Sequence, residues 1–261
     1  MKLKEAVDPL IMPSVAILCG GLGTRLRSAV TDRPKALADV AGRPFLAWVL
    51  DLLVGGGFRH VVLCTGHMGQ QIEAQFGASY QGLQLHYSLE QDLHGTGGAL
   101  RHALPLLGSE NILVMNGDSY CQANLGRFYC DHATSGANAS MLLCPMIDTS
   151  RYGSVKLTQN GFVDAFHEKN PNTEAGWINA GVYIVRYAML EAITPGAVCS
   201  LEREMFPSWI NLGLRGVKSD GPFVDIGTPE SYSSADLLFR TLSPSPFAIP
   251  VSPIASIEGL I

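Results

Sequence analysis

The amino-acid sequence predicts an α/β fold, in which a mostly parallel sheet is flanked by helices and carries a small β-hairpin insertion. Short apolar segments alternate with segments of helical periodicity along residues 15–146, as is typical of a parallel sheet with helices on both faces. Asn160 and Gly161 separate two later apolar segments, which predicts a tight hairpin turn. Glycines and carboxylates directly follow several predicted strands, where such a sheet binds its ligands.

The first half of the chain supplies most of the predicted parallel strands. Apolar runs predict these strands at residues 15–18, 60–65, 83–89, 111–115 and 139–146. Helical patterns predict intervening helices at residues 44–54, 70–76, 97–107 and 125–134. The first helix has Pro44 in its first turn and ends at the glycines of residues 55–57.

After Asp148 the pattern changes to include antiparallel pairing. Strands are predicted at residues 154–157 and 161–167, which form the hairpin, and at residues 177–185 and 216–225. Helices are predicted at residues 201–212 and 228–242, the latter with Thr228 as N-cap and Pro229 at its first position.

The length and composition limit the possible domain organisation and the possible partners. The chain has 261 residues, 47% of them hydrophobic, and a net charge of −5. We expect a single domain at residues 1–242 and a Pro/Ser-rich extended tail at residues 243–261, either free or docked on a neighbouring subunit of a homo-oligomer. The negative charge argues against nucleic-acid and membrane partners, and no uncharged, proline-free apolar run approaches the ~20 residues of a transmembrane helix.

The cysteines and histidines indicate no disulfide framework and no metal-binding cluster. The six cysteines include no C-x-x-C pair, and most lie in apolar runs, so buried free thiols are expected. Free thiols suit a reducing compartment, and residues 1–13 lack the apolar core of a signal peptide, which favours the cytoplasm. His67 and His94 are interpreted as solvated loop residues.

A glycine-rich segment with nearby cations follows the first predicted strand. Its glycines allow backbone N–H groups to turn toward a ligand. The cations that follow are Arg25, Arg27, Arg33 and Lys35. This pattern predicts a polyphosphate-binding loop rather than a surface loop with scattered basic residues. It is not a P-loop, because no Gly-Lys-Ser/Thr triplet occurs, and Leu26 replaces the last glycine of a dinucleotide-binding motif, which excludes an NAD-binding oxidoreductase.

Two aspartates follow predicted strands and are candidates for a metal site. Asp118 comes after the strand at residues 111–115, and Asp225 ends the strand at residues 216–225. Each alone is also typical of an ordinary turn. Together at the rim of a sheet, two carboxylates are suited to Mg²⁺, a hard ion that prefers oxygen ligands.

Several motifs resemble the sugar-1-phosphate nucleotidylyltransferases. They are G-G-x-G-T-R-L at residues 20–26, P-K at 34–35, G-x-P at 42–44, G-D at 117–118, E-K at 168–169, N-x-G at 179–181 and D-x-G-T-P at 225–229. The resemblance covers most of the chain. It implies a Rossmann-like sheet of the nucleotide-diphospho-sugar transferase type.

The resemblance also implies roles for the matching positions. Catalytic roles fall to Arg25, Lys35 and Asp118, and Mg²⁺ binding falls to Asp118 and Asp225. Nucleotide-binding positions are Leu18, Gly20, Gly21, Gly23, Thr24, Glu90, Gly95 and Thr96. Sugar-phosphate-binding positions are Asn116, Glu168, Lys169, Asn179 and Gly181.

Some of these segments have a plain structural alternative. A Glu168–Lys169 pair is also typical of a solvated turn, and here Asn170 separates it from the proline that usually follows directly in the family. The glycine-rich turn at residues 93–99 covers the nucleobase in the family, yet it also suits a helix entry that needs small residues for packing. The segment at residues 200–207 is taken as evidence for the fold and not as a site.

The resemblance implies transfer of a nucleoside monophosphate from an NTP to a sugar 1-phosphate, with Mg²⁺ as cofactor. Glu90 ends a predicted strand five residues before Gly95, at the rim of the sheet. A carboxylate there favours guanine, because it accepts from both N–H groups on that edge of the base, although a solvated glutamate at a strand end remains the alternative. Within the family, the branch that uses GTP and D-glycero-α-D-manno-heptose 1-phosphate for bacterial surface glycans is most similar. Guanylyl transfer to mannose 1-phosphate, uridylyl or thymidylyl transfer to hexose 1-phosphates, and a non-catalytic regulatory relative that binds nucleotide-sugar remain alternatives.

Overall fold

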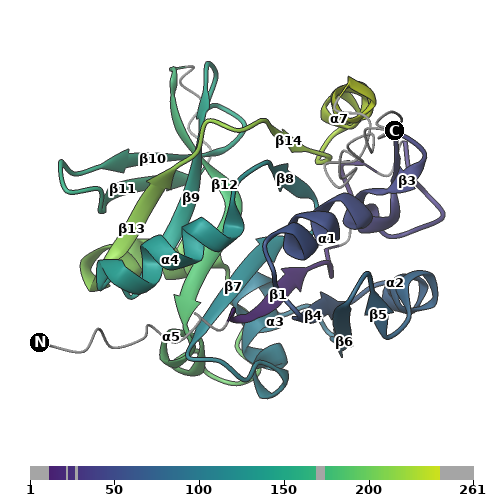
Figure 1. Ribbon diagram of the computed structural model, residues 1–261, viewed down its shortest axis with the longest axis horizontal. Coiled ribbons are helices and arrows are strands. Elements are labelled where there is room, and N and C mark those ends of the chain that lie inside the picture. Colours follow the sequence, from purple (N-terminus) through teal and green to yellow (C-terminus); the bar gives the residue numbers. More distant parts are fainter. Residues whose placement is uncertain (1–11, 22, 27–28, 169–173, 242–261) are drawn as a thin grey trace, which may run out of the picture.

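The fold is built on one mixed sheet of ten strands. The computed structural model describes residues 12–21, 23–26, 29–168 and 174–241. The strand order is β11-β10-β12-β7-β1-β4-β6-β5, and β9 joins β12 and β13 beside this path. Strands β7, β1, β4 and β6 are parallel at the centre, whereas β12 runs antiparallel to β7. The β10–β11 hairpin and the β5–α2 region lie at opposite ends of the molecule (Figure 1).

The elements have the following bounds. The central strands are β1 (Ser14–Leu18), β4 (His60–Thr65), β6 (Leu83–Leu89), β7 (Asn111–Asn116) and β12 (Gly176–Arg186). The other strands of this sheet are β5 (Ser79–Tyr80), β9 (Ala139–Met146), β10 (Gly153–Leu157), β11 (Val163–Glu168) and β13 (Leu214–Lys218). Two small separate sheets pair β2 (Asp39–Val40) with β3 (Arg43–Pro44), and β8 (Ser119–Cys121) with β14 (Phe223–Asp225).

The helices connect these strands. The α-helices are α1 (Phe45–Gly55), α2 (Gly69–Phe76), α3 (Gly95–Ala103), α4 (Leu125–Ser135), α5 (Tyr187–Glu191), α6 (Phe206–Trp209) and α7 (Pro229–Thr241). Short helical turns are η1 (Lys35–Leu37), η2 (Leu104–Leu106), η3 (Leu201–Met205, of π type) and η4 (Ile210–Leu212). Among the described helices, none is both long and apolar enough to cross a membrane.

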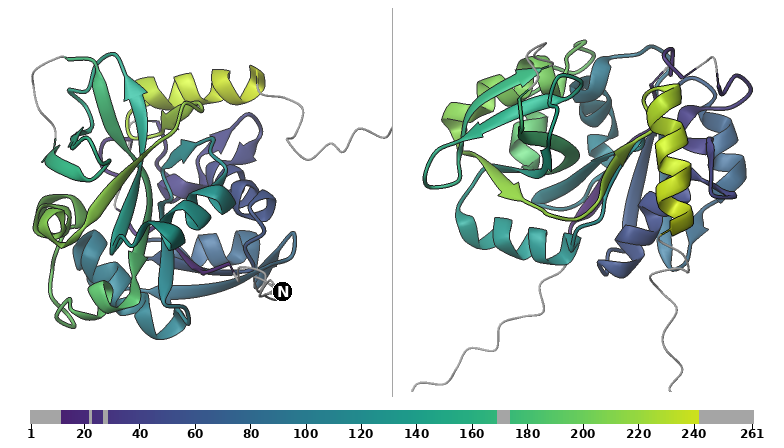
Figure 2. Two further views of the ribbon diagram at one scale, coloured as in Figure 1. Left: turned by 60° about the vertical axis from the view of Figure 1, so that its left-hand side comes forward. Right: turned by 90° about the horizontal axis from the view of Figure 1, so that it is seen from above.

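Helices cover both faces of the sheet because its innermost parallel strands, β1, β4 and β7, are apolar and buried on both sides. In β1, Val15 and Ile17 belong to a core shared with α1, α4 and α7, whereas Ala16 belongs to a second core with α3 and α5. Successive side chains of a strand point to opposite faces, so a continuous apolar run is needed for burial on both. Figure 2 shows the resulting arrangement from two further directions.

The predicted α/β class and the hairpin insertion are confirmed. The strands expected at residues 60–65, 83–89 and 139–146 coincide with β4, β6 and β9. Helix α7 begins at Pro229, and the Thr228 Oγ1 atom accepts a hydrogen bond from the Ser231 amide (3.3 Å), as expected of an N-cap. Five cysteines are buried as expected, but Cys130 is exposed. The tail at residues 243–261 lies outside the described residues.

Two predicted elements near the C-terminus are wrong in detail. The strand predicted at residues 216–225 is two strands in different sheets, β13 beside β9 and β14 beside β8. Gly221 lies at the switch, where a Cβ atom would be 1.8 Å from the Gln122 carbonyl oxygen, so only glycine permits this close approach. The helix predicted at residues 201–212 consists of η3, α6 and η4, which differ in helical type.

A buried histidine ties α4 to the sheet. His132 Nδ1 lies 2.8 Å from Ser140 Oγ of β9, and His132 Nε2 lies 3.2 Å from Asn111 Oδ1 of β7. Burial, together with the positive charges of Arg186 and Arg215, lowers the pKa of His132 to about 4. The folded protein therefore holds this imidazole neutral at a pH where the unfolded chain already protonates it.

Acidification should therefore destabilise the protein through His132. The unfolded histidine takes up its proton near pH 6.5 and the folded one only near 4, so stability falls as the pH decreases below about 6.5 and this loss ends below about 4. We expect about 2 kcal/mol of unfolding free energy to be lost through His132 between pH 7 and pH 5. His132→Asn should remove that part of the pH dependence in denaturant titrations. An unchanged pH dependence in the variant would contradict the assignment.

Candidate active site

A cavity of about 400 Å³ lies at the carboxyl ends of the parallel strands. Ligands bind at this edge in open α/β sheets, because loops after adjacent strands diverge there. The predicted residues that line the cavity are Leu18, Gly20, Gly21, Gly23, Thr24, Arg25, Lys35, Glu90, Gly95, Thr96, Asn116 and Asp118. Further lining residues are Cys19, Ala36, Leu93, Ala99, Gly117, Glu202 and Gly227.

The glycine-rich loop after β1 is fixed by hydrogen bonds to its neighbours. The Cys19 amide donates to the Cys64 carbonyl (2.8 Å), and the Gly117 amide donates to the Leu18 carbonyl (2.9 Å). A Cβ atom at Gly117 would lie 2.8 Å from Cys19 Sγ, so this approach requires glycine. Gly23 has a φ of +60°, a conformation that glycine adopts without strain. The backbone of this loop therefore lines the cavity with little side-chain bulk.

Two of the four predicted cations lie at the cavity. Lys35 Nζ is 2.6 Å from Asp118 Oδ2, and the lysine side chain is 13% exposed. Arg25 is exposed, lines the cavity beside Gly227, and makes no hydrogen bond or ion pair to the described part of the chain. Its guanidinium is thus available to an anion. Arg33 instead pairs with Asp32 at 2.8 Å and lines a neighbouring hollow, while Arg27 lies outside the described residues.

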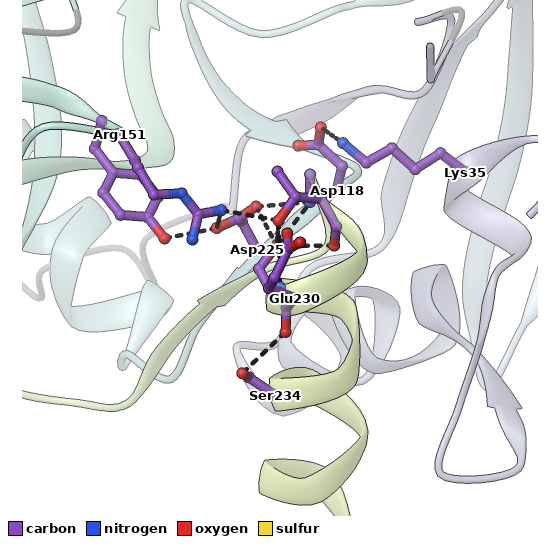
Figure 3. Close-up of polar contacts among 10 residues, drawn as sticks. Lys35, Asp118, Arg151, Asp225, Glu230 and Ser234 are labelled. Carbon is purple, nitrogen blue, oxygen red and sulfur yellow. Dashed lines mark hydrogen bonds and ion pairs between the residues drawn. The ribbon is translucent and has the colours of Figure 1, made fainter. Parts of the chain in front are cut away.

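Asp118 and Asp225 are brought together by the pairing of β8 with β14. Asp225 is opposite Ser119, and the Ile226 amide donates to the Asp118 carbonyl at 2.9 Å. Figure 3 shows both aspartates between Lys35 on one side and Arg151 on the other. Asp225 does not line the cavity itself, although Gly227, two residues later, does.

The Asp225 carboxylate is held by several donors. Tyr152 Oη donates to Asp225 Oδ2 at 2.7 Å. The Gly227 amide and Ser231 Oγ donate to Asp225 Oδ1 at 2.6 and 3.0 Å. Burial and the hydrogen bond to Asp225 raise the pKa of Tyr152, so its hydroxyl keeps its proton and remains a donor. Arg151 adds a cation whose Nη2 lies 4.0 Å from Asp225 Oδ2.

The aspartate pair fits the requirements of Mg²⁺. A carboxylate offers about four lone pairs, of which these contacts use three on Asp225 and one on Asp118. No cluster of three or more His, Cys, Asp or Glu side chains suited to a metal occurs among the described residues. Mg²⁺ is typically bound by one or two carboxylates together with substrate phosphates and water, so the chemistry of these two aspartates is compatible with the ion.

Buried Glu90 and partly exposed His94 form a pair beside the start of α3. Glu90 is 6% exposed and directly follows β6. His94 Nδ1 lies 3.1 Å from Glu90 Oε1. His94 lies in the loop before α3, as predicted, but its side chain is only 27% exposed and contacts Glu90 instead of being fully solvated.

The glycines at the start of α3 are required by packing. Cβ atoms at Gly95, Gly97 and Gly98 would lie 2.4 Å from the Cys199 oxygen, 2.6 Å from Cys199 Sγ and 2.4 Å from His94 Cβ, respectively. The helix-entry interpretation of this turn thus agrees with the structure, and Gly95 and Thr96 also line the cavity.

Most residues predicted to bind the sugar phosphate lie beside the cavity rather than on its wall. Only Asn116 lines it, while Glu168, Asn179 and Gly181 do not. The Asn179 side chain is engaged within β12, because its Nδ2 donates to Tyr183 Oη (2.8 Å) and its Oδ1 accepts from the Gly181 amide (2.9 Å). Gly181, with a φ of +74°, has no room for a Cβ atom beside Ser119 Oγ. Lys169 lies outside the described residues.

Glu202 is a cavity residue that the sequence analysis assigned only to the fold. It lies in η3, and its Oε2 atom accepts a hydrogen bond from Thr96 Oγ1 at 2.9 Å. Nothing in the sequence links the two positions, which are 106 residues apart.

Comparisons with known proteins agree with this geometry. Residues 14–240 match the family model described as Nucleotidyl transferase. A D-glycero-alpha-D-manno-heptose 1-phosphate guanylyltransferase from Aneurinibacillus thermoaerophilus is 37% identical over 84% of this chain and 95% of its own length. A mannose-1-phosphate guanylyltransferase from Mycobacterium tuberculosis is 34% identical over 88% of this chain and 66% of its own length.

A solved structure shows the same fold. The structure of HddC from Yersinia pseudotuberculosis complexed with GMP-PN superposes with a TM-score of 0.77 and 28% identity, over 87% of this chain and all of that chain.

Gly21 provides a test of the cavity that is independent of protein packing. A Cβ atom at Gly21 would meet no protein atom within 4 Å, although Gly21 lines the cavity. We expect Gly21→Ala to fold with unchanged or slightly higher thermal stability, because the folded chain has room for the methyl group. We expect the variant to bind GTP at least about 10-fold more weakly in calorimetry, because that methyl group occupies ligand space, and about 1.4 kcal/mol corresponds to a factor of 10.

The matched control is Gly108→Ala. Gly108 also has open space at its Cβ position but does not line this cavity. It should bind GTP like the parent. Equal GTP affinity in both alanine variants would show that the loop backbone does not approach the nucleotide.

Proposed function

The chain belongs to the nucleotidyl transferase family, and from this premise we propose that it transfers GMP from GTP to D-glycero-α-D-manno-heptose 1-phosphate. It is a sugar-1-phosphate nucleotidylyltransferase. In the proposed reaction, an oxygen of the sugar 1-phosphate forms a bond to the α-phosphorus of GTP. The bond from that phosphorus to the bridging oxygen of the β-phosphate breaks, and pyrophosphate leaves. The observation that carries the proposal is one cavity lined by the glycine loop, by Lys35 with Asp118, and by Glu90.

Arg25 and Lys35 are proposed to stabilise charge on the triphosphate. Arg25 has a guanidinium without a partner in the described part of the chain, and Lys35 is held at the cavity by Asp118. Phosphoryl transfer depends chiefly on alignment and on stabilising charge, so it needs no nucleophile from the protein. The backbone of residues 19–21 and 23–24 is proposed to lie along the phosphates.

Asp118 and Asp225 are proposed to hold Mg²⁺. Bound there, the ion would neutralise charge on the phosphates that react. Tyr152, Ser231 and the Gly227 amide fix the orientation of the Asp225 carboxylate. Lys35 neutralises part of the charge on Asp118 and keeps it near the glycine loop.

The resemblance to the family supports the assignment of the acceptor side. Lys169 is proposed to bind the phosphate of the sugar and Glu168 its hydroxyl groups. Asn179 and Gly181 are proposed to shape this side through β12, since both pack within the strand. Asn116 is proposed to complete the pocket from the end of β7.

Glu90 is proposed to select guanine. Its buried carboxylate can accept hydrogen bonds from guanine N1–H and the 2-amino group, while uracil and thymine would present carbonyl oxygens on either side of one N–H. His94 contacts Glu90 Oε1 and so orients the carboxylate. The cytoplasm is proposed as the site of action.

A mannose 1-phosphate acceptor is the second candidate, supported by relatives of that activity. A non-catalytic nucleotide-sugar-binding role is less well supported, because the cavity retains Arg25, Lys35 and Asp118, with Asp225 adjacent.

The substrates are tested by a pyrophosphate-release screen of GTP, UTP, dTTP and ATP against a panel of sugar 1-phosphates. We expect the highest kcat/KM with GTP and the manno-configured heptose 1-phosphate. Glu90→Gln should lower kcat/KM for GTP by about 10²-fold or more, because an amide presents a donor to one of the two guanine N–H groups. Glu73→Gln, on the exposed side of α2, is the matched control and should behave like the parent. A parent enzyme that prefers UTP or dTTP would refute the guanine assignment.

Asp225→Asn tests the metal site. The amide keeps the shape and its oxygen still accepts from Gly227 and Ser231, while the Tyr152 hydroxyl must turn to accept from the amide nitrogen. The thermal stability without metal should therefore change only modestly. The Mg²⁺ concentration for half-maximal rate should rise at least about 10-fold and kcat should fall by about 10²-fold, because one anionic ligand is lost.

Asp164→Asn, on the exposed side of β11, is the control for this loss of charge. A variant at Asp225 whose Mg²⁺ titration matches that of Asp164→Asn would show that Asp225 is structural.

A further inference from the structure

Glu202 presents a carboxylate oxygen to the cavity that no described residue uses. Its Oε2 atom accepts hydrogen bonds from Thr96 Oγ1 at 2.9 Å and from Ser200 Oγ at 2.8 Å. Its Oε1 atom makes no hydrogen bond to the described residues. The carboxylate is therefore oriented through one oxygen, and the other remains an acceptor beside the cavity.

The segment that carries Glu202 is firmly positioned. Glu202 lies in η3, a single π-type turn, and such turns are frequent at functional sites. The Leu201 amide donates to Thr96 Oγ1 (2.8 Å), the Gly97 amide to the Cys199 carbonyl (3.0 Å), and the Cys199 amide to the His94 carbonyl (2.9 Å). The close packing of residues 197–199 on the glycines of α3 is what requires those glycines. This arrangement fixes the carboxylate relative to the cavity wall.

The turn that carries Glu202 packs against β12, on the side of the cavity proposed for the acceptor. Phe206 directly follows η3, and its ring centroid lies 4.8 Å from that of Tyr183 in β12. The Tyr183 hydroxyl accepts a hydrogen bond from Asn179 Nδ2 at 2.8 Å. Burial raises the pKa of this hydroxyl, and the negative charges of Glu202, Asp118 and Glu168 raise it further. Glu90 lies in the part of the wall proposed for the base.

We propose that Glu202 is a specificity-determining residue that accepts, through Oε1, a hydrogen bond from a hydroxyl group of the sugar 1-phosphate. This inference rests on the proposed function. An ionised carboxylate only accepts hydrogen bonds and repels phosphate, so a hydroxyl group is the part of either substrate that suits it. The ribose of the nucleotide offers the same chemistry, and the experiment distinguishes the two sources.

The test compares the parent with Glu202→Gln, using GTP and whichever of heptose 1-phosphate and mannose 1-phosphate reacts faster. We expect kcat/KM for the sugar 1-phosphate to fall about 10- to 100-fold, as for loss of a hydrogen bond to a charged group, and KM for GTP to stay within about twofold. Among sugar 1-phosphates that each lack one hydroxyl group, one should lower kcat/KM of the parent by a similar factor. The same compound should lower kcat/KM of Glu202→Gln little further. This non-additivity identifies the hydroxyl that Glu202 contacts.

The matched control is Glu204→Gln in the same turn. Glu204 is exposed, accepts from the Ser200 amide (3.0 Å) and does not line the cavity, so its variant should match the parent for both substrates. Ser200→Ala removes one of the two donors that orient Glu202 and should give a smaller loss in the same direction. It provides the measurement if Glu202→Gln does not fold.

Three outcomes would overturn the inference. If the loss of kcat/KM in Glu202→Gln is non-additive with the loss caused by 2′-deoxy-GTP or 3′-deoxy-GTP, and not with that caused by a deoxygenated sugar, the contact belongs to the ribose. Equal kcat/KM losses for both substrates, or no loss beyond that of Glu204→Gln, would leave Glu202 a structural residue. In all three cases an active parent would leave the proposed function intact. A parent that releases no pyrophosphate with any sugar 1-phosphate would refute the proposed function together with this inference.

Discussion

The hydrogen bond from the Gly117 amide to the Leu18 carbonyl is the contact on which the cavity depends. It extends the pairing of β1 with β7 beyond the strand ends, and so it holds the glycine loop beside Asn116 and Asp118. The salt bridge between Lys35 and Asp118 then bridges the same two segments through side chains. Without this juxtaposition, the loop backbone and the strand-end carboxylate would not share one cavity.

The charged groups of the cavity keep free hydrogen-bond acceptors and donors that a ligand can use. Glu90 is buried and Glu202 is partly exposed, and each has one carboxylate oxygen engaged by neighbours. A ligand group that cannot donate to the buried Glu90 carboxylate would leave a costly unpaired acceptor. Arg25 is instead exposed and without a described partner. Anionic and hydroxyl- or N–H-bearing parts of a substrate are therefore favoured at different parts of one wall.

Sequence patterns predicted the parts of the site that are local in the chain. The glycine loop follows β1 directly, and Asp118 follows β7, so strand-end reasoning located both. The pairing of β14 with β8 could not be predicted, because each has three residues and the predicted strand at residues 216–225 hid the change of partner at Gly221. Glu202 was missed because its carboxylate is positioned by Thr96, far away in the sequence. A single polar residue is not part of a periodic sequence pattern, so the sequence does not indicate which distant residue it contacts.

The pairing of β8 with β14 also determines when the site is completed during folding. The parallel strands β1, β4, β6 and β7 all lie within residues 14–116, and contacts between nearby segments form early. Asp225 reaches Asp118 only after β14 has closed a long loop onto β8, which carries an entropic cost. Because Asp225 comes far later in the chain, the ribosome synthesises the glycine loop, Lys35 and Asp118 well before the second aspartate.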